Sequence, residues 1–212
     1  MEKYEKKSQG SHNLFLDNSL LVFSSKMKFH FLLLSIFLIA GLLVGSIAAS
    51  SMKTEDGKIF IPLFFSGIPT IGSSFFSSFS TLLLNTIIHL ILLFLAGTTA
   101  FGFLAIPVIV LFKGLSIGVA AVSFLANGSH GLIESSFVYM PAMAFISLIV
   151  VLFALQALLF STSFSKSFFS AGKVEIPDFT EYLKNFFLFL FFSVIACFIG
   201  AGFTMLYPLI FV

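Results

Sequence analysis

The sequence predicts an all-α protein, a polytopic membrane helix bundle with about five transmembrane helices. Hydrophobic residues make up 58% of the 212 residues and charged residues only 9%, and the mean hydropathy is +1.12. A soluble domain carries charge on about a quarter of its residues. Because a helix needs about 20 apolar residues to cross a bilayer core, this chain has room for roughly four to six spans. No sizeable soluble catalytic domain fits beside them.

The first 28 residues are predicted to form a cytoplasmic N-terminal tail, and residues 29–212 an integral membrane domain. Lysines are frequent in the tail, and the apolar stretch at residues 14–23 is typical of a short interfacial helix. The first span is predicted at residues 29–49. The lysines before this span and the small residues at its C-terminal end resemble a secretory signal. Its apolar region is too long for such a signal, so we expect an uncleaved anchor.

The second span is predicted at residues 75–96 and the third at residues 101–126, with only a tight turn between them, so the two should be antiparallel neighbours. The preceding segment, residues 51–74, is rich in Pro and Gly and is expected to be a non-cytoplasmic loop that dips into the interface. Asn85 and His89 lie four residues apart in the second span and therefore share a helical face. That face should point toward other helices, because polar side chains in lipid need partners.

Lys113 is the outstanding residue of the third span, which also has Pro107 near its start. A lysine in the middle of an apolar helix costs about 2.5 to 3.5 kcal/mol on insertion scales and is retained only when something satisfies it. We expect the third helix to be interrupted near Lys113 and Gly114. Lys113 then either stabilises the fold through a polar contact to another helix or contacts an ion or substrate, and its partner cannot be read from the sequence.

The fourth span is predicted at residues 137–160, with Pro141 kinking its first turn or separating it from the preceding piece. A mixed-charge segment at residues 161–185 follows, in which Pro177-Asp178 is typical of a helix start. The last span is predicted at residues 185–206, before Tyr207-Pro208.

The distribution of lysines predicts the orientation of the five spans. Five lysines lie in the tail and three in the segment 161–185, against two in the segment 51–74. Because cytoplasmic segments carry the excess of positive charge, the N-terminus is predicted to be cytoplasmic and the C-terminus outside. The expected location is the bacterial cytoplasmic membrane.

Two GxxxG patterns lie in the first and third spans. Such patterns let helix backbones approach closely in a membrane, where lipid supplies no hydrophobic drive for association. Internal packing is one interpretation, and contact with a partner or a second copy of the chain is the other. The glycines are Gly41 and Gly45 in the first span and Gly114 and Gly118 in the third.

The sequence offers no catalytic or cofactor-binding constellation. His130 and Glu134 have workable spacing for two metal ligands, but no third ligand strengthens the site. No nucleophile elbow, Walker loop or dinucleotide fingerprint is present. We therefore expect no enzyme activity, no cofactor and no metal. The formal net charge of +2 is too small to indicate nucleic-acid binding.

Residues 97–118, GTTAFGFLAIPVIVLFKGLSIG, follow the pattern G-x4-G-x4-P-x4-F-K-G-x3-G. This pattern resembles the central signature of the stage II sporulation protein M family. Asn85 upstream, Pro141 at the start of the fourth span and the final Tyr207-Pro208 agree with the family layout, and the resemblance is specific over about residues 85–145. The chain departs from the family in its Ser- and Phe-rich first loop and in lacking an acidic residue in the last span. The signature residues are Gly97, Gly102, Pro107, Lys113, Gly114 and Gly118.

The resemblance implies a multi-pass membrane protein of endospore-forming bacteria. Members of this family anchor two secreted peptidoglycan-degrading partners, a lytic transglycosylase and an amidase/endopeptidase, during engulfment of the forespore. The implied role is a membrane scaffold that localises these hydrolases and is not itself one of them. From the GxxxG patterns we expect a partner's membrane anchor to dock on a small-residue groove of the first or third span.

A second interpretation remains open beside the scaffold. Asn85 in the second span, together with Pro107, Lys113 and the expected interruption in the third, is also compatible with a small transporter or permease-like component. The expected partners are therefore membrane lipid and peptidoglycan hydrolases, with a homo-oligomer as a further possibility and no nucleic acid.

Overall fold

The computed structural model describes residues 25–51, 74–125, 136, 139–169 and 178–211, and all of the regular structure in these residues is helical. Five helices there are long and apolar enough to cross a membrane, as predicted, so the protein is a multi-pass membrane protein. The helices are α2 (Ser25–Ser51), α4 (Phe75–Gly97), α5 (Gly102–Leu125), α7 (Met140–Phe169) and α8 (Phe179–Phe211).

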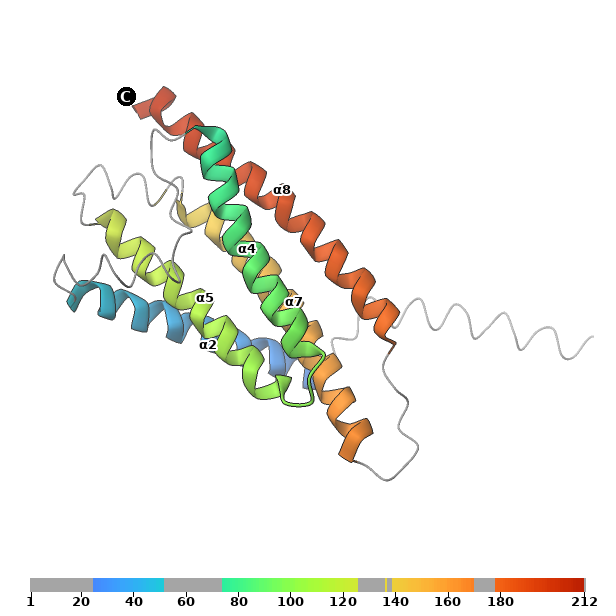
Figure 1. Ribbon diagram of the computed structural model, residues 1–212. Helices are drawn as coiled ribbons and strands as arrows, with labels where there is room; N and C mark the ends of the chain where they lie inside the picture. The colour runs from blue at the N-terminus through green and yellow to red at the C-terminus, as the bar shows by residue number, and fades with distance from the viewer. Residues whose placement is uncertain (1–24, 52–73, 126–135, 137–138, 170–177, 212) are drawn as a thin grey trace, which may run out of the picture.

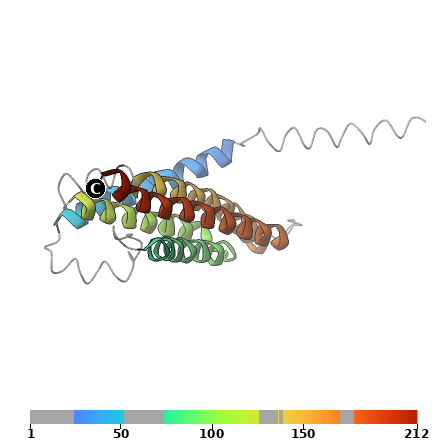
Figure 2. The same cartoon turned by 90° about the horizontal axis from the view of Figure 1, so that it is seen from above.

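The five helices form one bundle in which α7 contacts each of the other four. α2 packs chiefly against α5, and α4 packs chiefly against α8. Figures 1 and 2 show the helices lying side by side, with the first turns of α2 extending away from the rest in Figure 2. Successive helices run in alternating directions, so the start of α2 and the end of α8 lie at opposite ends of the bundle (Figure 1).

The predicted interruption of the third span was wrong. α5 is one continuous helix from Gly102 to Leu125, with Lys113 and Gly114 inside it. A glycine inside a helix costs about 0.5 to 1 kcal/mol relative to alanine. Here close packing against a neighbouring helix outweighs that intrinsic preference, as tertiary contacts often do.

Several helix ends also differ from the predicted spans. α2 begins at Ser25, four residues before the predicted first span. α7 continues to Phe169 because the polar residues after 160 contain no helix breaker, and hydropathy measures contact with lipid rather than helical conformation. Pro208 does not end the last helix, which runs on to Phe211.

α8 begins where Pro177-Asp178 indicated a helix start, six residues ahead of the predicted last span. The carboxylate of Asp178 accepts a hydrogen bond from the backbone N–H of Thr180 at 2.8 Å. Its carbonyl accepts another from the N–H of Tyr182 at 3.2 Å. The first bond satisfies a donor that a helix N-terminus leaves free, and the second is the first i→i−4 bond of the helix.

α4 and α5 are antiparallel neighbours joined by a tight turn, as predicted. A hydroxyl from α7 holds the turn, because Ser161 Oγ donates to the carbonyl of Thr99 at 2.8 Å. Gly97 and Gly102 stand on either side of the turn. A side chain at Gly97 would collide with the Tyr182 hydroxyl, and one at Gly102 with the Ala96 carbonyl and with Ser161.

The GxxxG glycines join α2 and α5 backbone to backbone. A Cβ added at Gly41 or Gly45 would collide with the α5 backbone, and one at Gly114 or Gly118 would collide with the α2 backbone. The backbone of each helix therefore occupies the space beside the glycines of the other, and internal packing is the correct interpretation. The expectation that a partner docks on these glycines was wrong, because no free groove remains at them.

This packing predicts opposite effects for two glycine-to-alanine substitutions. Gly114→Ala should lower the free energy of unfolding by about 1 to 3 kcal/mol, because the new methyl group meets the Leu38 carbonyl. The matched control is Gly202→Ala in α8, where an added Cβ meets nothing within 4 Å. It should be neutral or stabilising by up to about 1 kcal/mol.

Unfolding titrations in detergent micelles would measure both variants. Equal effects of the two substitutions would contradict the glycine interface.

Candidate functional site: a buried polar cluster around Lys113

Lys113 lies in the interior of the bundle. Its side chain is only 1% exposed and is among the largest fully buried side chains in the described residues. Its ammonium donates a hydrogen bond to Asn85 Oδ1 on α4 at 2.6 Å. The bond links the middle of α5 to the middle of α4, so Asn85 is the partner that the sequence left unidentified.

α4 presents three buried polar residues to this region. Asn85, Thr86 and His89 lie on one side of the helix and all three are buried. The prediction that the face with Asn85 and His89 points toward other helices is therefore confirmed. The Nδ1 atom of His89 lies 2.7 Å from the carbonyl of Asn85. A carbonyl can only accept, so Nδ1 carries the proton and Nε2 of the neutral ring is left as an acceptor.

Cys197 on α8 completes the cluster. Its Sγ lies 3.8 Å from the Thr86 hydroxyl, and that hydroxyl donates its own proton to the Leu82 carbonyl at 2.8 Å. The thiol is therefore the donor of the pair. Lys113 is within electrostatic range of both His89 and Cys197, so three helices contribute polar groups to one buried region.

No carboxylate accompanies the lysine in the part of the chain that the structure describes. The acidic residues there are Asp178 and Glu181, both at the start of α8. Cys197 lies 16 or more residues farther along the same helix, which corresponds to roughly 24 Å or more. Lys113 is thus satisfied by a neutral carboxamide rather than by an ion pair.

This arrangement is suited to holding helices in register. A buried amine that loses its acceptor pays a full desolvation penalty, so the Lys113–Asn85 bond strongly favours one alignment of α4 and α5. Because Lys113 is 1% exposed, it is closed to solutes in this conformation. Among the described residues, no group of three or more His, Cys, Asp or Glu side chains could hold a metal ion.

The structure disperses the other predicted site residues. Gly41, Gly45, Gly114 and Gly118 form the α2–α5 contact, and Gly97 and Gly102 flank the α4–α5 turn. Pro107 is buried inside α5. Pro141 is the second residue of α7, a position where a proline is tolerated because its missing N–H has no intrahelical partner there. Of the predicted residues, only Asn85 and Lys113 bond to each other.

Several other predictions fall on residues outside the described ranges. These are the interfacial helix of the tail, the loop between the first two spans and the pairing of His130 with Glu134.

Sequence reasoning did not single out Tyr182, which lies in the mixed-charge segment 161–185. Its ring stacks on Phe160 of α7 at 4.3 Å and on Phe94 of α4 at 5.1 Å between ring centroids. Its hydroxyl donates to the Phe94 carbonyl at 3.2 Å. The Asp178 helix start was the signal that could have placed Tyr182 in the first turn of a helix.

Comparisons with protein-family models, with curated proteins and with solved structures found no match to this chain. The sporulation-family resemblance therefore stays a prediction that rests on residues 97–118 and their surroundings.

The Lys113–Asn85 bond predicts strong coupling between two substitutions. Asn85→Leu leaves the buried amine without its acceptor, and Lys113→Met leaves the carboxamide oxygen without its donor. Combining both removes the two orphaned groups together, so the double variant should be more stable than the sum of the single effects by about 1.5 to 3 kcal/mol.

A double-mutant cycle of unfolding in micelles measures this coupling. The control cycle pairs Lys113→Met with Ser161→Ala, whose hydroxyl bonds at the turn before α5, and should be additive. Additivity of the Lys113 and Asn85 effects would show that the bond does not form.

Proposed function

We propose that the protein is a scaffold of the bacterial cytoplasmic membrane that anchors and localises peptidoglycan-remodelling hydrolases, during forespore engulfment in sporulation. The observation that carries the proposal is the role of the signature residues. Gly97, Gly102, Pro107, Lys113, Gly114 and Gly118 are all buried. They build helix contacts and a turn rather than an open reacting centre, which is what a scaffold needs from its central motif.

The physical effect of such a scaffold is confinement. A hydrolase held at the membrane is restricted to the layer beside its wall substrate, and its effective concentration there rises without any new contact to the wall. In this proposal the chain contributes no catalytic group. Its N-terminus is cytoplasmic and its C-terminus faces the wall, following the lysine distribution.

The second candidate, a small transporter, is favoured by one observation, a buried amine beside which the described residues place no carboxylate. In a transporter Lys113 would meet a solute in another conformation. Flux through reconstituted protein that disappears in Lys113→Met would support this candidate. Normal recruitment of hydrolases by the same variant would support the scaffold.

Affinity purification from the membranes of the native bacterium tests the scaffold directly. Peptidoglycan hydrolases should be enriched with the tagged protein over an untagged strain, and Lys113→Met should recover the same hydrolases in membranes where it accumulates normally. An ATP-binding subunit in place of hydrolases would contradict the scaffold and favour transport.

Reporter fusions test the proposed orientation. A reporter at the N-terminus should be active only in the cytoplasm and one at the C-terminus only outside, because five spans place the two ends on opposite faces. The two reporters should give the reverse pattern if the lysine distribution has been misinterpreted. Signals from the same face would contradict a five-span protein.

A further inference from the structure

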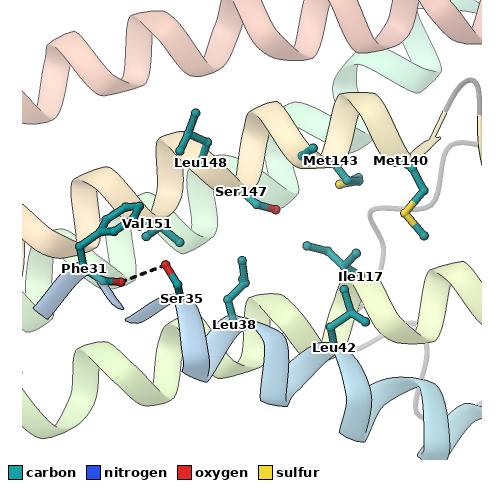
Figure 3. A pocket seen from close by; sticks show the side chains of 11 residues that line it. Phe31, Ser35, Leu38, Leu42, Ile117, Met140, Met143, Ser147, Leu148 and Val151 are labelled. Atoms are coloured by element: carbon teal, nitrogen blue, oxygen red, sulfur yellow. Dashed lines mark hydrogen bonds between the residues drawn. The ribbon is translucent and has the colours of Figure 1, made fainter. Parts of the chain in front are cut away.

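We draw no further inference here: the strongest candidate, the apolar groove of about 310 Å³ between α2, α5 and α7 (Figure 3), carries nothing because no feature of the described residues shows what covers it.

Discussion

The close contact between the backbones of α2 and α5 is the interaction that holds α2 in the bundle. α2 has few other contacts, and lipid offers no hydrophobic gain for helix association. Four glycines remove the side chains that would keep the two helices apart, so dispersion contacts and backbone dipoles act at short range. The intrinsic cost of glycine in a helix is recovered only because both faces are fitted to each other.

α5 combines two different kinds of contact within one turn. Lys113 points to α4 and bonds to Asn85, whereas the next residue, Gly114, meets the backbone of α2. Consecutive helical residues differ in direction by about 100°, so adjacent residues can serve two neighbours. The directional bond sets the alignment of α4, and the flat glycine face sets the distance to α2. α5 therefore contacts α4 through a directional bond and α2 through a flat glycine face.

The sequence predicted the number and approximate position of the spans because hydropathy reports contact with lipid directly. It also identified Lys113, Asn85 and the glycines as residues that need partners. It could not pair them, because Asn85 and Lys113 are 28 residues apart. No local sequence pattern indicates which distant residues come into contact. The interruption predicted at Gly114 was wrong because the local helix preference of glycine was weighed without the packing that overrides it. The last span was predicted to begin too late in the sequence because hydropathy was followed in place of the helix-start signal at Pro177-Asp178.

The signature residues of α5 shape the groove between α2 and α7 without lining it. Gly114 meets the backbone of Leu38, and Gly118 meets that of Leu42. The side chains of these two leucines form part of the groove wall opposite α7. Any side chain at either glycine would push α2 outward and move that wall relative to α7. A packing motif therefore sets the shape of this groove from inside the bundle, because the width of the groove depends on how closely α2 approaches α5.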